Sequence, residues 1–577
     1  MILKALYDYY HRSSNLPLMG TELKEIGYLI VIDEDGAFLH LESRMLDNQM
    51  ATRYLVSQTI PRSGRKFVAN YLWDNCDYVI GYSAAKMDKA KICNDVFVQR
   101  VKELKDHLPH NQTIKAIYAF YNKYPNIQHV IESDPLWHEM VSSKKNISFL
   151  LQGNTTIAAA EDDVIHYSSC QVGNSETHVC LVTGNKGATA RLHSKIPLQG
   201  NKFTSLVSFK DGKGYDSYGH AQGINAPVSE EAEFAYSTAL NHMLEKNSRN
   251  KFNIGSRTFV FWASNNHEAG RRAEESLFDL FGFSDAESDD PNAKIEQVRK
   301  VFKAIYSGEL NTSLDDKFYI LGLAPNAARI AVVYWAEIPL KIFAKRINQH
   351  FEDMKICGAK KPYMALRSIL GAVTLGGKSS DVTPNLPDAL VKSIFQGIPY
   401  PYTLFTSCIR RIKAEMAKEK YNEAVKKGYI TIRAAIIKAY LNRLINNNEQ
   451  KIEEMLDQSN NNQGYLCGRL FAVLDKIQEE ANKQHTIRER YMNSASATPA
   501  AVFSTILNLS LHHSEKLEER RNVWFEKLKQ EIIEKLDADG FPAHLDLQDQ
   551  GRFFVGYYHQ RQKLFTKNEK EENNNNQ

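Results

Sequence analysis

The chain has 577 residues and a net charge of +4, with 43% hydrophobic and 24% charged residues. Because single hydrophobic cores rarely grow past roughly 250–300 residues, we expect several domains. The composition is typical of a soluble globular protein. The charge excess is modest for this length, which excludes a uniformly basic surface, so nucleic acid would have to be held by local basic patches.

Seven cysteines are scattered along the chain without a CxxC pair. This spacing argues against a disulfide scaffold or a zinc ribbon and favours a reducing compartment. The N-terminal stretch MILKALYDYYHR contains Lys4 and Asp8, and its apolar run is too short for a signal peptide. No apolar run approaches the length that spans a bilayer. We therefore expect a cytoplasmic protein.

The first predicted elements are a short helix and a hairpin. Residues 1–11 have the apolar periodicity of a helix. IGYLIVI at 26–32 is a strand pattern, and the turn DEDG connects it to a second strand at 37–41. A helix predicted at 86–107 carries six basic residues, but a charged helix face is usually only solvated.

A basic loop, PRSGRK at 61–66, runs into the aromatic segment FVANYLWDNCDYVIG at 67–81. Basic, aromatic and amide side chains in alternation are typical of phosphate contacts beside base contacts. The alternative is that the tryptophan and tyrosines belong to the core while the basic turn is solvated. The candidate contact residues of this stretch are Arg65, Lys66, Asn70, Trp73 and Asn75.

The stretch 210–246 combines a glycine-rich polar loop with a helix. Glycines let a backbone approach a ligand, lysines reach phosphates, aromatic rings stack on bases, and amides read base edges. Pro227 and Ser229 indicate the start of the helix, which has one apolar stripe. The alternative is an ordinary surface connection. The candidate contact residues of the loop are Lys210, Lys213, Tyr215, Tyr218, Gln222 and Asn225.

The element pattern predicts an α+β fold: a mixed N-terminal region with mostly antiparallel strands, followed by an all-α C-terminal bundle. Strand patterns recur within 147–207, and helical periodicity dominates after 340. The tail KNEKEENNNNQ lacks apolar residues and is expected to be disordered. We divide the chain into an α+β region at 1–340, a helical connecting region at 341–450, a helical bundle at 451–565 and a tail at 566–577.

No catalytic, metal or cofactor site follows from the sequence. LGGKSS at 375–380 resembles the end of a phosphate-binding loop, but Gly371 is one residue too far away and a helix precedes it instead of a strand. No HExxH motif occurs, and no histidine is followed directly by an aspartate as in the His-Asp pair of metal-dependent HD nucleases. A Ser–His–Asp triad assembles only across a fold, so the sequence does not exclude one. We expect a protein that is not an enzyme.

Ten segments, in order from the first residue to Leu507, together resemble the large subunit of the type I-C CRISPR surveillance complex, Cascade. They are MILKALYDYY, IGYLIVIDEDG, NYLWDNCDYVIGY, CLVTGNKGATARLHSKI, GYDSYGHAQGINAPVSEEAEFAYSTALNHML, FVFWA, LGLAPNAARIAVVYW, GIPYPYTLFTSCIRRIKAE, GYLCGRLFAVLDKIQEEAN and RYMNSASATPAAVFSTIL. Each is short, but their order along most of the chain is specific.

The resemblance implies a DNA-binding role without catalysis. In that family the subunit lies beside the backbone and 5′-handle subunits of a crRNA-bound complex and recognises the protospacer-adjacent motif (PAM) in duplex DNA. It promotes unwinding and R-loop formation, supports the displaced strand and helps recruit the helicase-nuclease. In RNA-guided systems of this kind the protein reads the short motif while guide pairing reads the rest.

The resemblance gives the two loop stretches, 65–75 and 210–225, the roles of PAM contact or wedge, because opening a duplex usually requires an inserted side chain. On the helical side it suggests strand or phosphate contacts for Arg410, Arg411 and Lys413, and contacts with displaced single strand for Arg469, Arg488 and Arg490. The alternative for these six is a solvated face.

Type I-C systems can also make their small subunit from an internal start in this gene. Met455 precedes a segment of bundle-forming helices and is the candidate start, the alternative being an ordinary residue that ends a helix. Two other functions remain open: an architectural subunit that only bridges its neighbours, and a nuclease with an unrecognised site.

Overall fold

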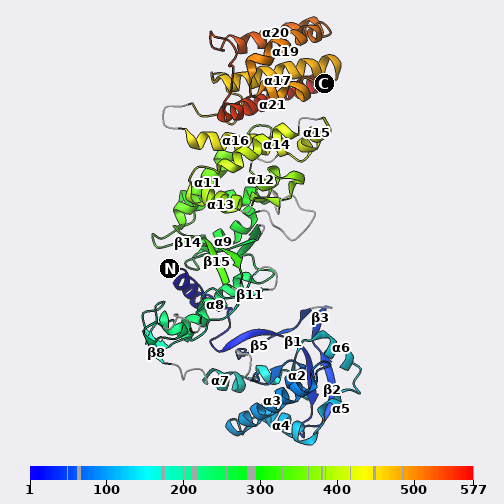
Figure 1. Ribbon diagram of the computed structural model, residues 1–577, viewed down its shortest axis with the longest axis vertical. Coiled ribbons are helices and arrows are strands. Elements are labelled where there is room, and N and C mark those ends of the chain that lie inside the picture. Colours follow the sequence, from blue (N-terminus) through cyan, green and yellow to red (C-terminus); the bar gives the residue numbers. More distant parts are fainter. Residues whose placement is uncertain are drawn as a thin grey trace. The chain divides into compact units, whose positions relative to one another are not determined.

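The computed structural model in Figure 1 describes residues 1–47, 50–60, 67–170, 176–198, 202–210, 212, 217–254, 256–281, 294–327, 329–360, 363–378, 381–383, 385–415, 418–445, 450–483 and 486–575. The chain divides into two compact units. Unit 1 consists of Met1, Leu3–Lys195 and Val207–His242, and unit 2 consists of Ile2, Ile196–Leu206 and Met243–Gln577. Each unit has its own hydrophobic core.

Unit 1 is built on a five-stranded sheet in the order β2-β1-β7-β6, with β5 also paired to β1. The predicted N-terminal hairpin is confirmed, since β1 and β2 pair antiparallel, whereas β1 and β7 pair parallel. The strands of this unit are β1 (Thr21–Ile32), β2 (Phe38–Ser43), β3 (Met45–Asp47), β4 (Met50–Ala51), β5 (Arg53–Ser57), β6 (Trp73–Asp74), β7 (Asn146–Leu151), β8 (Thr177–Val179) and β9 (Lys186–Ala188).

Helices pack on this sheet through apolar faces. The buried side of α4 meets β1 and β7, where Phe120 and Phe149 contact edge to face. The helices of unit 1 are α1 (Ile2–Arg12), α2 (Cys76–Val79), α3 (Met87–His107), α4 (Gln112–Lys123), α5 (Ile127–Ile131), α6 (Trp137–Ser143), α7 (Asp162–Cys170) and α8 (Glu230–Leu244), with 3-10 turns η1 (Ala158–Ala160), η2 (Ser217–Gly219) and η3 (Gln222–Asn225). The helices predicted at 1–11 and 86–107 are thus present as α1 and α3.

Unit 2 begins with an antiparallel sheet in sequence order, β12-β13-β14-β15. Its strands are β12 (Lys251–Ile254), β13 (Arg257–Ala263), β14 (Lys317–Asn326) and β15 (Arg329–Pro339), and β10 (Ile196–Leu198) pairs with β11 (Lys202–Thr204) nearby in the sequence. Helices α9 (Glu268–Phe281) and α10 (Ile295–Ser307) connect β13 to β14. The α+β fold predicted from the sequence is therefore confirmed.

Helices form the rest of unit 2. They are α11 (Leu340–Met354), α12 (Leu366–Ala372), α13 (Asn385–Gln396), α14 (Tyr402–Ala414), α15 (Lys418–Lys426), α16 (Tyr429–Leu444), α17 (Gln463–Asn482), α18 (Thr486–Ala495), α19 (Pro499–Ser514), α20 (Glu519–Ile533) and α21 (Leu547–Asn575), with a 3-10 turn η4 (Leu375–Gly377) in the LGGKSS run. The predicted boundary at 340 falls inside unit 2, because α11 follows β15 directly and packs against α10. The α21 backbone stays helical to Asn575, where composition alone indicated no regular structure.

The C-terminal helices form the predicted bundle, in which α17 and α21 pack most extensively (Figure 1). Glycines make their close approach possible. A Cβ on Gly468 of α17 would overlap the Phe553 carbonyl of α21, and a Cβ on Gly556 of α21 would overlap the Tyr465 carbonyl of α17. Because backbone atoms occupy these spaces, the helices could not keep this distance with any larger residue.

Gly468→Ala is expected to lower the thermal unfolding temperature of the full chain, because the added methyl group must push α17 and α21 apart. Overpacking of this kind costs about 1–3 kcal/mol, more than the gain in helix propensity from glycine to alanine. Asn508→Ala on the exposed side of α19 is the control and should change stability by less than about 0.5 kcal/mol. Equal unfolding temperatures for the two variants would contradict this packing.

Candidate nucleic-acid interface

Helix α8 and the loop before it form a small substructure of unit 1 together with α1. Tyr7 donates a hydrogen bond to Glu231 over 3.0 Å, and the rings of Tyr10 and Phe234 contact edge to face at 5.8 Å. The predicted helix of the 210–246 stretch is therefore confirmed, with its apolar side buried. The loop is mounted on an element with a fixed position.

Backbone contacts hold the end of the loop against residues 189–191. The amide of Ala190 donates to the Val228 carbonyl over 2.9 Å, and the amide of Gly223 donates to the Arg191 carbonyl over 3.2 Å. A Cβ on Gly223 would overlap the Ala190 carbonyl, so only glycine permits this approach. These contacts define the loop platform, which consists of residues 189–191 and 217–226.

Buried polar groups of α8 also bond residues 193–194, next to the loop platform. The ring of His193 lies 2.6 Å from the Tyr236 hydroxyl, and Glu233 accepts a hydrogen bond from the amide of Ser194 over 2.7 Å. Burial lowers the pKa of His193 to about 4, so this imidazole is neutral at physiological pH. Burial also raises the pKa of the Glu233 carboxyl. These bonds attach α8 to the strand-like segment that leads into the platform.

The thiol of Cys180 anchors the start of α8. Its sulfur accepts hydrogen bonds from the amides of Ser229 and Val182 at 3.2 and 3.4 Å. Burial raises the pKa of this thiol, but hydrogen bonds from Ser229 and Thr183 outweigh burial and bring the pKa down to about 7. Cys180 is 1% exposed, so it belongs to the anchor and not to a ligand-accessible surface.

Within the platform, the predicted contact residues differ sharply in exposure. Tyr218 is 97% exposed, with a left-handed backbone at φ 58°. Gln222 is only 9% exposed, and its side-chain oxygen accepts a hydrogen bond from Arg191 over 2.7 Å. Asn225 donates to the carbonyls of His220 and Gln222 and so closes the 3-10 turn. The structure thus leaves Tyr218 available to a ligand and uses the two amides internally.

Lys210 and Arg191 add exposed positive charge to this part of unit 1. Arg191 was not among the residues predicted from the sequence. The sequence pattern around Arg191, which lies at a bend, gave no signal, because the contact with Gln222 is formed only in the fold. Lys213 and Tyr215 lie outside the described residues.

In the 65–75 stretch, the described candidates are structural. Trp73 is 1% exposed, and its indole donates to the Ser57 carbonyl. Asn70 is buried and bonded to Asp74, while Asn75 caps α2 by accepting from the amide of Tyr78. Both amides thus have hydrogen-bond partners within the fold. Arg65 and Lys66 lie outside the described residues.

The basic candidates of unit 2 also separate by burial. Arg411 pairs with Glu415, and Lys413 donates to Gln550 over 2.7 Å. Arg469 is buried against Gln560 and Glu531, and Arg488 is buried over the Tyr421 ring. Arg490, by contrast, is exposed. Arg410 is exposed as well. Arg410 and Arg490 are exposed, whereas Arg411 and Lys413 are half-buried.

Metal and membrane features were also sought in the described part of the chain. No group of three or more His, Cys, Asp or Glu residues there is arranged to hold a metal ion. None of the described helices combines the length and apolarity needed to cross a bilayer. The buried histidines have structural partners, as His350 does in Tyr400 and His559 in Tyr465.

The sequence was compared with known families and with curated proteins. A family model described as CRISPR-associated protein (Cas_Csd1) matches residues 6–565. The chain therefore belongs to this family of CRISPR-associated proteins, which supports the Cascade-type subunit that the sequence resemblance indicates. No match was found among curated proteins.

Gly223→Ala is expected to release η3 from residues 189–191, since the new methyl group would occupy the space of the Ala190 carbonyl. Limited proteolysis of the full chain should then cut the platform several-fold faster than in the wild type. Gly219→Ala is the matched control, because it adds backbone strain in the same loop but has no atom within 4 Å of the added carbon. Equal cleavage rates in the two variants would argue against the close approach at Gly223.

Proposed function

We propose that this chain is the non-catalytic large subunit of type I-C Cascade and recognises the PAM of target duplex DNA in the cytoplasm. The observation that carries the proposal is the family match over residues 6–565, together with the ordered segments that resemble this subunit. Its partners would be the crRNA-bound backbone and 5′-handle subunits, the small subunit and the helicase-nuclease. Guide pairing would read the target while this protein reads only the short motif.

The loop platform supports a specific way of engaging the duplex. An exposed aromatic ring on an anchored loop can insert between base pairs or stack on a base freed by unwinding. Tyr218 has this combination of exposure and anchoring. Unstacking one base step of DNA costs a few kcal/mol, so the loop platform must hold the inserted ring in place. Gly223, Gln222 and Asn225 provide that support in our proposal.

Exposed basic side chains would supply the phosphate contacts. Lys210 and Arg191 have exposed positions in unit 1, and we assign them to the backbone of the PAM duplex. We assign Arg410 and Arg490 of unit 2 to the displaced single strand. Such contacts position the nucleic acid without reading its sequence and make binding dependent on salt concentration.

Tyr218→Ala should weaken binding of a PAM-containing target duplex by the reconstituted complex about tenfold. Stacking of one aromatic side chain on a base contributes about 1–3 kcal/mol, and 1.4 kcal/mol corresponds to a factor of ten. The measurement is duplex affinity at fixed salt, with assembly of the complex checked by size-exclusion chromatography. A pre-opened target should show a smaller loss, since no wedge is needed there.

The control is Tyr306→Ala, which removes a partly exposed tyrosine from α10 of unit 2. If Tyr218→Ala binds the duplex with wild-type affinity, Tyr218 does not contact the DNA as proposed, but the assignment of the chain as a Cascade subunit is unaffected. A complex that lacks this chain is tested in the same way. If that complex still discriminates between PAM and non-PAM duplexes, the proposed function is overturned and the architectural alternative is favoured. Metal-dependent DNA cleavage by the pure chain would instead favour a nuclease.

We also propose that Met455 is the start of a separate small-subunit product. Met455 is 63% exposed and lies in the irregular segment between α16 and α17, not at the end of a helix. A product starting there would contain α17–α21 with the whole glycine-mediated contact between α17 and α21. It would lose α14 and α16, whose Phe405 and Ile437 side chains lie against Gly551 of α21.

Met455→Leu should eliminate a short C-terminal polypeptide from cells that express the gene, while the full-length chain remains at its normal level. Leucine conserves volume at this exposed position, so the fold should not change. Immunoblotting with a C-terminal tag measures both products. Met492→Leu is the control and should leave the short product in place. If the short product persists in Met455→Leu, it does not start at this codon.

A further inference from the structure

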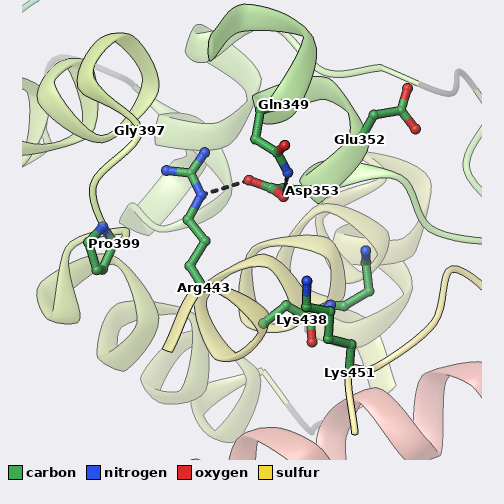
Figure 2. Close-up of a pocket in the computed structure, with 9 residues that line it drawn as sticks. Gln349, Glu352, Asp353, Gly397, Pro399, Lys438, Arg443 and Lys451 are labelled. Carbon is green, nitrogen blue, oxygen red and sulfur yellow. Dashed lines mark hydrogen bonds and ion pairs between the residues drawn. The ribbon is translucent and has the colours of Figure 1, made fainter. Parts of the chain in front are cut away.

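A cavity of about 430 Å³ lies among the helices of unit 2, away from the loop platform in the sequence (Figure 2). Three elements surround it: α11, the turn after α13, and α16 with the segment that follows. The lining residues are Gln349, Glu352, Asp353, Gly397, Pro399, Lys438, Asn442, Arg443 and Lys451. The volume is in the usual range for small-molecule sites, roughly 300–1,000 Å³.

One wall of the cavity is a closed hydrogen-bond network. Asp353 accepts from Arg443 over 2.7 Å, as the dashed line in Figure 2 shows, and from Gln349 over 2.8 Å. It also accepts from the Tyr400 hydroxyl over 3.3 Å. The charges of Asp353 and Arg443 therefore neutralise each other, and the wall is rigid.

Arg443 is held on several sides but is not saturated. One terminal nitrogen donates to the carbonyls of Ser393 and Ile398, and the guanidinium lies 3.9 Å from the centre of the Tyr400 ring. The other terminal nitrogen, Nη2, is buried without a hydrogen-bond partner among the described residues. This nitrogen has no open surface, so the Arg443 guanidinium supports the wall and is not offered to a ligand in the cavity.

Lys438 is the anomaly of this cavity. It is 4% exposed, and no residue of the described chain forms a hydrogen bond or ion pair with its ammonium group. Its ammonium group faces the cavity, so an anion bound there would supply the counter-charge that a largely buried lysine otherwise lacks. Lys451, which lies beside it below Asp353 and Glu352 in the view of Figure 2, likewise has no such partner in the described ranges.

The acidic groups nearby that the structure describes do not supply a counter-ion to Lys438 or Lys451. Glu352 pairs with Lys355 at 2.5 Å and lies 3.7 Å from Arg299, so its charge is already shared. Burial lowers the pKa of Lys438, and the more distant carboxylates of Asp353, Glu454, Glu453 and Glu352 oppose that shift without overcoming it. Among the described residues, the ammonium groups of Lys438 and Lys451 therefore have no carboxylate at hydrogen-bonding distance.

We propose that this cavity binds a phosphate-bearing group no larger than a mononucleotide, either a free ligand or the 5′-terminal nucleotide of a strand, whose oxyanion pairs with Lys438 and Lys451. A dianionic phosphate matches two ammonium groups in charge, and lysine binds phosphate as a compact point charge with three donors. This site is independent of the PAM contacts proposed above.

The test uses the full chain with three probes: inorganic phosphate, AMP, and a short oligonucleotide with or without a 5′-phosphate. Binding is measured by calorimetry and by the rise in unfolding temperature. Lys438→Met should weaken binding at least about tenfold, as expected for loss of a charged hydrogen bond, and Lys451→Met should weaken it less because that lysine is more exposed. If AMP or free phosphate binds more tightly than the oligonucleotide, the cavity is a small-molecule site. If the oligonucleotide binds more tightly and only with its 5′-phosphate, the cavity holds a strand end.

A second measurement separates a binding lysine from a structural one. Without ligand, Lys438→Met should unfold at a higher temperature than the wild type, because a buried unpaired charge is replaced by an apolar side chain of similar length. Lys341→Met on the exposed side of α11 is the control and should change neither binding nor stability. The proposal is overturned if no probe binds the wild type, or if binding survives unchanged in both Lys438→Met and Lys451→Met.

Discussion

The backbone contact between η3 and residues 189–191 determines what unit 1 can present to a ligand. It requires a glycine at 223, because the Ala190 carbonyl occupies the space that a side chain would need. The contact lets Gln222 turn inward to Arg191 while Tyr218 extends into solvent. The close approach at Gly223 thus accounts for the inward position of Gln222, while Tyr218 in the preceding 3-10 turn stays exposed.

Periodicity and turn residues predicted most of the fold, and α1, the β1–β2 hairpin, α8 and the helical C-terminal half follow the patterns of local sequence. Single site residues were harder to predict. Trp73 and Arg488 are residue types that are common in nucleic-acid contacts, yet both are buried. Residue type does not encode which side of an element faces the core. The cavity at Lys438 could not be predicted from the sequence pattern, because it is formed by helices that are distant in the sequence.

Family membership and geometry contribute different parts of the functional account. The match to CRISPR-associated proteins over residues 6–565 assigns the class. Among the described candidates the structure separates exposed side chains from buried ones, such as Arg469, which bonds Gln560 and Glu531 inside the bundle. The mechanism proposed here depends on the few exposed groups that an anchored scaffold presents.

The contact of α17 with α21 has a genetic consequence. Both helices follow Met455, so a polypeptide begun at that codon would inherit the same glycine-lined seam. One missense change at Gly468 would then alter both the full chain and the proposed short product, whereas a change in unit 1 would affect the full chain alone. Selection on this seam would be correspondingly doubled.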